Sequence, residues 1–119
     1  LIEFEVLNIE NNKRLKKFTL VNSSDFDITK IANTFKRLYA KNSTNEFLLQ
    51  FPFNIFSLIE NLDLSYNLIT PILLNHINFN SFIKLKNLFL VRCNFSYDLR
   101  YFENLIHLKS IDLSENKLN

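Results

Sequence analysis

Few residues of this chain could do acid–base, nucleophilic or metal chemistry, and their spacing does not join them in one site. The single cysteine, Cys93, and the two histidines, His76 and His107, are too few for a structural zinc site. Two aspartates, Asp63 and Asp112, occupy equivalent positions in two similar segments. On strands separated by one more strand they would stand about 10 Å apart, which is only loosely compatible with paired carboxylates, and ordinary surface aspartates explain them better. We therefore expect no catalytic residue, no metal, no cofactor and no enzyme activity.

The composition excludes several other kinds of protein. No glycine is present, so the glycine-dependent phosphate loops and the nucleophile elbow of hydrolases cannot be built. One cysteine cannot form a disulfide within the chain, and a formal net charge of +2 is too small to indicate nucleic-acid binding. The apolar stretches are far shorter than the about 20 residues that span a bilayer, so we expect no direct membrane contact. The chain starts at Leu1, and we expect a fragment of a longer protein.

An apolar spacing that occurs five times indicates the elements that must position these side chains. Each occurrence reads apolar-x-x-apolar-x-apolar, and the starts are Leu15, Phe35, Ile59, Leu85 and Leu108. Alternate residues of a strand face opposite sides, so the last two apolar residues of each motif point inward and the residue between them points outward. We expect one short strand in each segment, with neighbouring strands parallel.

The last three segments continue to a polar turn residue, at Asn67, Cys93 and Asn116. An asparagine there can donate to and accept from the backbone of adjacent segments, so we predict structural turn roles for Asn67 and Asn116. Cys93 has the same position and is expected to be a small buried turn residue rather than a reactive thiol. Ser23 and Ser43 take this position, with a weaker match, in the first two segments.

Together these positions form the pattern L-x-x-L-x-L-x-x-N/C-x-L, and the chain resembles the leucine-rich repeat superfamily over nearly all of its length. A phenylalanine stands six residues before three of the starts, at Phe53, Phe79 and Phe102. This register resembles the typical subclass, which Toll-like receptor ectodomains and small extracellular proteoglycans carry. The resemblance implies an α/β solenoid, a horseshoe segment with a parallel concave β-sheet and a 3₁₀-helical, helical or irregular convex side.

The chain departs from the family pattern in two respects. Ala40 and Asn45 stand where leucines are expected, and Thr29 replaces the convex phenylalanine of the second repeat. The clustered cysteines that cap such ectodomains are absent from this sequence.

The repeats predict one leucine-rich repeat domain over residues 1–119. About five repeats are expected to start near 15, 35, 59, 85 and 108. Residues 1–14 are expected to form a cap or an irregular repeat, in which Phe4 and Val6 would point inward. The strand preceding the second repeat is accordingly expected near Phe18 and Leu20.

The outward strand positions and the turns after them form the expected binding surface, because solenoids bind partners on the concave face. Tyrosine and arginine dominate binding hot spots, and exposed apolar groups often mark a partner. The predicted ligand-binding residues are Tyr39, Asp63, Tyr66, Phe89, Val91, Arg92 and Asp112. The alternative for Phe89 is that it packs against Tyr66 and only covers the sheet.

Two further surface signals have an ordinary explanation beside a functional one. The amino-terminal half is basic and would steer an acidic partner, or its charges are a solvated strand border; the residues are Lys13, Arg14, Lys16, Lys17, Lys36, Arg37 and Lys41. The three N-x-S/T sequons at Asn22, Asn42 and Asn94 are glycosylation candidates, although the abundance of Asn, Ser and Thr yields nearly as many by chance.

Two functions follow as expectations. The first is a non-catalytic protein-binding module in a receptor ectodomain, secreted or on the extracellular side of the plasma membrane, that recognises a protein or microbial ligand. Such a receptor would be a glycoprotein in signal transduction and could dimerise. The second is a cytoplasmic leucine-rich repeat scaffold for a phosphatase, a GTPase or a cytoskeletal partner, which the single cysteine and the missing cysteine caps favour.

Overall fold

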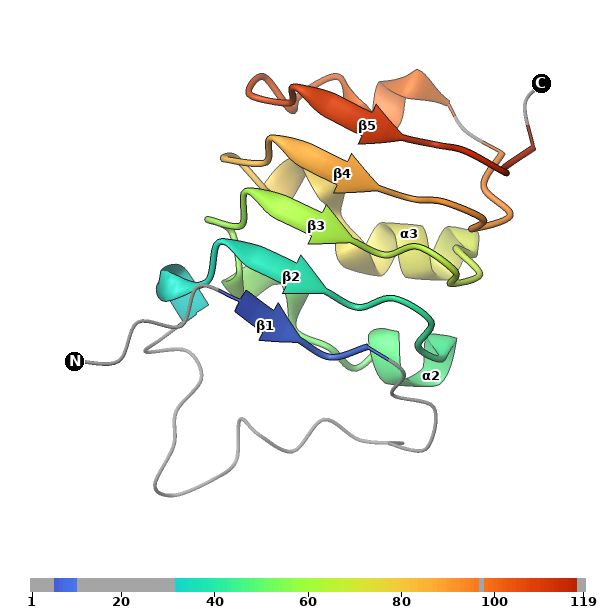
Figure 1. Ribbon diagram of the computed structural model, residues 1–119, viewed down its shortest axis with the longest axis horizontal. Coiled ribbons are helices and arrows are strands. Elements are labelled where there is room, and N and C mark those ends of the chain that lie inside the picture. Colours follow the sequence, from blue (N-terminus) through green and yellow to red (C-terminus); the bar gives the residue numbers. More distant parts are fainter. Residues whose placement is uncertain (1–5, 11–31, 97, 118–119) are drawn as a thin grey trace.

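A five-stranded parallel sheet organises the protein in the computed structural model, which describes residues 6–10, 32–96 and 98–117. The strands lie in the sheet in the order in which they occur in the chain (Figure 1). They are β1 (Val6–Asn8), β2 (Arg37–Tyr39), β3 (Asn61–Asp63), β4 (Asn87–Phe89) and β5 (Ser110–Asp112). This parallel sheet with short connecting helices is an α/β arrangement.

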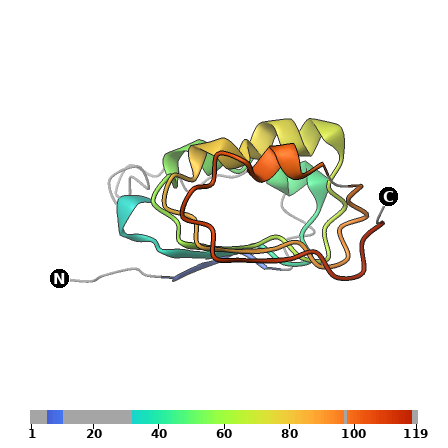
Figure 2. The ribbon, with the colours of Figure 1, turned by 90° about the horizontal axis from the view of Figure 1, so that it is seen from above.

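The helices are short and lie opposite the sheet, so that the strands form one layer and the helices another (Figure 2). We call the face of the sheet that points away from the helices the outer face. The helices are η2 (Ala32–Thr34), α2 (Asn45–Leu48), η3 (Phe53–Ile55), α3 (Pro71–Ile77), η4 (Phe79–Ser81) and η5 (Leu99–Phe102).

The longest helix, α3, begins and ends at residues with clear local reasons. The Thr70 side chain caps its first turn by accepting a hydrogen bond from the Leu73 backbone N–H at 3.2 Å. Pro71 follows, where a missing N–H costs nothing. Asn78, with φ of 51°, ends the helix in the left-handed conformation that glycine normally supplies.

Each strand turns its central apolar residue toward the helices. Leu38, Leu62 and Leu88 stand opposite one another in the ladder and are fully buried, while the residues on either side are at least partly exposed. This alternation follows from the two-residue period of a strand. The predicted strands of the last four segments are therefore confirmed, each within one residue.

Phenylalanines fill the space between the sheet and the helices. The predicted positions Phe53, Phe79 and Phe102 are all buried. Phe51 stacks on Phe56 with a centroid distance of 5.2 Å, and Phe79 lies 5.5 Å from Phe102 in the next segment. Large aromatic rings thus share the interior with the buried leucines, and both contribute buried apolar surface.

The strand beside β2 differs from the prediction. β1 pairs directly with β2, and Leu7 stands opposite Leu38. The repeat predicted from Leu15 therefore does not supply this strand; residues 11–31, including Leu15, lie outside the described part. The expected inward role of Val6 is also wrong, because Val6 is 43% exposed whereas Ile9 is buried. A three-residue error in register exchanges the two faces of a strand.

Candidate functional site

The turns that follow β2, β3, β4 and β5 share one unusual backbone conformation. Asn42, Tyr66, Arg92 and Glu115 all have positive φ, between 50° and 60°. Their positions are equivalent, because each backbone N–H of the first three donates to a carbonyl of the next turn at 2.8 to 3.0 Å. Left-handed backbone costs bulky residues about 1–3 kcal/mol each, and such strain is concentrated at functional sites. The chain has no glycine to relieve it, so this row displays large side chains.

Tyr66 is the centre of this row. The Lys41 ammonium lies 5.4 Å from the centroid of the Tyr66 ring, and the Arg92 guanidinium lies 5.9 Å from it. Arg92 also forms an ion pair with Glu115 at 2.9 Å. The Tyr66 side chain nevertheless remains 42% exposed. Two cations therefore lie within cation–π distance of an accessible aromatic ring, and a carboxylate pairs with one of them.

The neighbouring row runs through the strands themselves. Tyr39, Asp63, Phe89 and Asp112 stand in register across β2 to β5, and all four are half-buried on the outer face. Phe89 is thus less exposed than an isolated surface phenylalanine would be. Val91, half-buried, comes two residues after it. The fold brings the predicted ligand-binding residues onto one face, in adjacent rows.

The two aspartates of this row are bound to their own turns. Asp63 accepts a hydrogen bond from the Ser65 backbone N–H at 2.9 Å, and Asp112 accepts one from the Ser114 backbone N–H and another from its hydroxyl. The hydrogen bonds from Ser114 lower the pKa of Asp112. Phe89 stands between the two carboxylates in the ladder. These contacts give both aspartates a structural use as turn residues.

A polar row that the sequence did not indicate lies next to this one. The Asn61 side-chain oxygen accepts a hydrogen bond from the Asn87 amide, whose own oxygen accepts one from the Ser110 hydroxyl at 2.6 Å. The three side chains are joined across β3, β4 and β5. Only the strand register reveals this ladder, because the residues are more than twenty positions apart in sequence.

Beneath the turns, the predicted turn residues bind the backbone of the preceding segment. The Asn67 amide donates to the Ala40 and Leu64 carbonyls at 2.9 and 2.8 Å, and its oxygen accepts from the Ser43 N–H at 2.7 Å. Asn116 makes the corresponding bonds to the Leu90 and Leu113 carbonyls. The structural roles predicted for these two asparagines are confirmed.

Cys93 and Ser43 occupy the same position and make simpler versions of these bonds. The Cys93 thiol donates to the Leu64 carbonyl at 3.3 Å, and the Ser43 hydroxyl donates to the Ile9 carbonyl at 3.2 Å. Cys93 is fully buried, and burial raises the pKa of its thiol to about 11. Cys93 therefore is a buried turn residue, as predicted, and its low reactivity stays a prediction.

The sequons differ in accessibility. Asn94 is exposed and has a left-handed backbone, with φ of 49°. Asn42 is half-buried within the row of turns described above, and Asn22 lies outside the described residues. Of the two candidates that the structure describes, Asn94 is therefore the more accessible acceptor.

The two histidines remain apart from each other and from Cys93. The His76 Nε2 atom lies 2.8 Å from the Phe51 carbonyl, and the ring meets Phe53 edge-on at 5.8 Å. His107 is exposed before β5. Within residues 6–10, 32–96 and 98–117, no three His, Cys, Asp or Glu residues are grouped closely enough to hold a metal ion.

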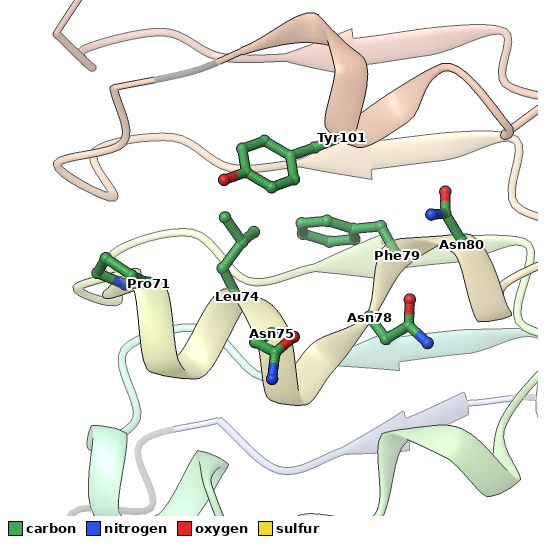
Figure 3. Close-up of a pocket in the computed structure, with 7 residues that line it drawn as sticks. All are labelled: Pro71, Leu74, Asn75, Asn78, Phe79, Asn80 and Tyr101. Atoms are coloured by element: carbon green, nitrogen blue, oxygen red, sulfur yellow. The ribbon is translucent and has the colours of Figure 1, made fainter.

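Two hollows lie away from the outer face, and the sequence indicated neither. One, of about 270 Å³, lies on the helical side, where the Tyr101 ring approaches Leu74 and Phe79 (Figure 3). Asn75 and Asn78 line it too, but their side chains point away from Tyr101. The other, a groove of about 470 Å³, lies where the strands begin and contains three lysines.

No family model matches the chain, and neither a curated protein nor a solved structure matches it. Among the described residues, no helix has the length and apolar character required to cross a membrane.

Proposed function

We propose that this chain is a segment of a leucine-rich repeat solenoid of the typical subclass, and that its outer face is the concave surface that binds a protein partner without catalysis. The recurring backbone contacts support the repeat assignment. Ser43, Asn67, Cys93 and Asn116 each donate to the equivalent carbonyl of the preceding segment. A repeat unit that cannot bury its apolar face alone needs such contacts with its neighbours.

The observation that carries the binding proposal is the position of Tyr66 between Lys41 and Arg92. Tyrosine and arginine are the side chains most enriched at binding hot spots. A ring held between two cations loses little conformational freedom when a partner covers it, so less binding free energy is spent on ordering. Phe89 and Val91 place half-buried apolar surface nearby. An aromatic centre with a charged rim is the anatomy of a protein interface.

A receptor ectodomain outside the cell is the setting we favour, because the phenylalanine register resembles that of extracellular family members. The intracellular scaffold is the alternative. The lone cysteine favours the scaffold only weakly, since Cys93 is buried in a structural position and would stay unpaired in either compartment. Mass added at Asn94 after passage through a secretory pathway separates the two settings.

The proposal is tested by capturing a partner on the outer face and then weakening the contact. A photoreactive amino acid at Val91 is used to attach and identify the partner covalently. Affinity for that partner is then measured with the double variant Tyr66→Ala and Phe89→Ala. We expect a loss of more than about 2 kcal/mol of binding free energy, as hot-spot truncations give, with an unchanged circular dichroism spectrum.

Tyr101→Ala is the matched control, because Tyr101 is 45% exposed on the helical side, close to the exposure of Tyr66. Its affinity should equal that of the wild type. An equal loss with Tyr101→Ala would place the interface elsewhere. Unfolding of the double variant would mean that Tyr66 and Phe89 are structural.

A further inference from the structure

The groove at the amino-terminal ends of the strands carries an excess of positive charge. It has a volume of about 470 Å³, and its lining residues are Asn33, Lys36, Leu58, Glu60, Lys84, Lys86 and His107. Three ammonium groups thus face one carboxylate. The strands begin at this edge, on the left of the sheet in Figure 1, away from the turns that contain Tyr66.

The backbone ladder holds these charges in a row. The Lys36 carbonyl accepts hydrogen bonds from the Glu60 and Asn61 N–H groups at 2.7 and 2.9 Å. The Glu60 carbonyl accepts in the same way from Lys86 and Asn87, at 2.8 and 3.0 Å. Residues 36, 60 and 86 immediately precede β2, β3 and β4 and are therefore neighbours along one edge of the sheet, at the strand spacing of about 5 Å. Their side chains project from one edge.

Glu60 neutralises only part of this charge. Its carboxylate forms an ion pair with Lys86 at 2.8 Å. The hydrogen bond from Lys86 lowers the pKa of Glu60, and the positive charges of Lys86, Lys36 and Lys84 lower it further. Neither Lys36 nor Lys84 forms an ion pair with any residue that the structure describes. Three cations thus act on this carboxylate, and two of them have no ion-pair partner among residues 6–10, 32–96 and 98–117.

We propose that this groove binds an acidic segment of a protein partner, whose carboxylates pair with Lys36 and Lys84 beside the Lys86–Glu60 ion pair. Two ammonium groups that pair with no carboxylate in the described part of the chain are suited to carboxylates from a partner. Leu58 adds apolar surface for the aliphatic part of such a peptide. This site is separate from the outer face, and it does not depend on the binding proposed for Tyr66.

Three observations favour carboxylates over phosphate or nucleic acid. Lysine also binds phosphate, but phosphate sites commonly add free backbone N–H groups or the fork of an arginine, and the N–H groups of residues 60, 61, 86 and 87 are already bonded to carbonyls. The groove has no arginine among its lining residues. It also has no Phe, Tyr or Trp on which a base could stack.

The test uses the 119-residue chain and a short fluorescein-labelled peptide of alternating Asp and Ala, with Asn replacing Asp in the control peptide. Fluorescence anisotropy is measured at low and at physiological salt. We expect the acidic peptide alone to bind, and added salt to weaken binding because these charges are exposed to solvent.

Variants then locate the site. Lys36→Gln with Lys84→Gln should weaken the peptide about fivefold to tenfold, from the loss of two exposed charge pairs. Glu60→Gln should strengthen it, because Lys86 is released. Lys117→Gln removes one exposed lysine outside the groove and should change affinity little, as should Tyr66→Ala on the outer face. Circular dichroism and the thermal unfolding midpoint confirm that each variant is folded.

Glu60→Gln is expected to raise the affinity for the peptide, whereas the lysine variants lower it. A gain in affinity cannot result from unfolding, so this variant separates an effect on binding from a general loss of fold. Absence of peptide binding at low salt would overturn the inference. So would an equal loss with Lys117→Gln. If inorganic phosphate or a single-stranded oligonucleotide binds more tightly than the peptide, and the lysine variants weaken that binding, the groove serves the other class of ligand and the inference is wrong.

Discussion

The two ends of the strands share one backbone ladder and use their polar side chains in opposite ways. At the carboxyl ends, Asn67 and Asn116 turn inward and bind carbonyls of the preceding segment. At the amino ends, the carbonyls of Lys36 and Lys86 accept bonds from the next segment, whereas their side chains line a groove. A polar side chain that hydrogen-bonds otherwise unpaired backbone groups has a structural role. A polar side chain that the backbone does not require as a hydrogen-bond partner is available to bind another molecule.

Removing an inward amide should have the largest effect. Asn67→Ala leaves buried carbonyls of Ala40 and Leu64 without their side-chain donor. We expect the free energy of unfolding to fall by about 2–4 kcal/mol, from the cost of unsatisfied buried groups. Urea denaturation measures the change. Asn75→Ala, on the exposed surface of α3, is the control and should cost less than about 0.5 kcal/mol. Equal midpoints for the two variants would show that the inward amide of Asn67 is not structural.

Cys93 occupies the turn position equivalent to Asn67 and Asn116, and the fold should protect its thiol from reaction. With its pKa raised from 9.0 to about 11, Cys93 holds about 100-fold less thiolate near pH 8 than a normal cysteine. Reaction with a disulfide reagent is expected to be at least that much slower in buffer than in concentrated urea. Rapid labelling of the native protein would show that the Cys93 thiol is accessible to the reagent and that the fold does not protect it.

The Lys86–Glu60 pair at the amino ends should contribute least. The pKa of Glu60 is lowered from the ordinary 4.5, so its stabilisation is present above that pH and is lost as the pH falls through the folded-state value. Lys86→Ala should therefore reduce stability by at most about 1 kcal/mol near neutrality, with a smaller difference from the wild type in acid. Denaturation as a function of pH measures this. If Lys86→Ala lowered the free energy of unfolding as much as Asn67→Ala, the Lys86–Glu60 ion pair would have a structural role.

Much of the sheet could be predicted, because the signal is local. Leu38, Leu62 and Leu88 follow from the apolar spacing, since a two-residue period places them on one side of a strand. The turn roles of Asn67 and Cys93 follow from the chemistry of their side chains at a recurring position. These expectations required no knowledge of which segments lie side by side.

Pairing at the amino terminus could not be predicted in the same way. Leu15-x-x-Phe18-x-Leu20 matches the motif as well as the segment around Leu7, and the choice between them depends on which strand meets β2. That contact joins Leu7 to Leu38, thirty-one residues later in the chain. Local periodicity contains no information about such a distance.

The binding surfaces show the same division. The sequence by itself determined that the chain has outward rows of side chains, that no glycine relieves the turns, and that its inner positions are apolar. Only the tertiary structure decided that Lys41 and Arg92 lie near the Tyr66 ring, and that three lysines line one groove with Glu60. The physical reason is that these groups come from different segments, and parallel pairing of the strands sets which of them become neighbours.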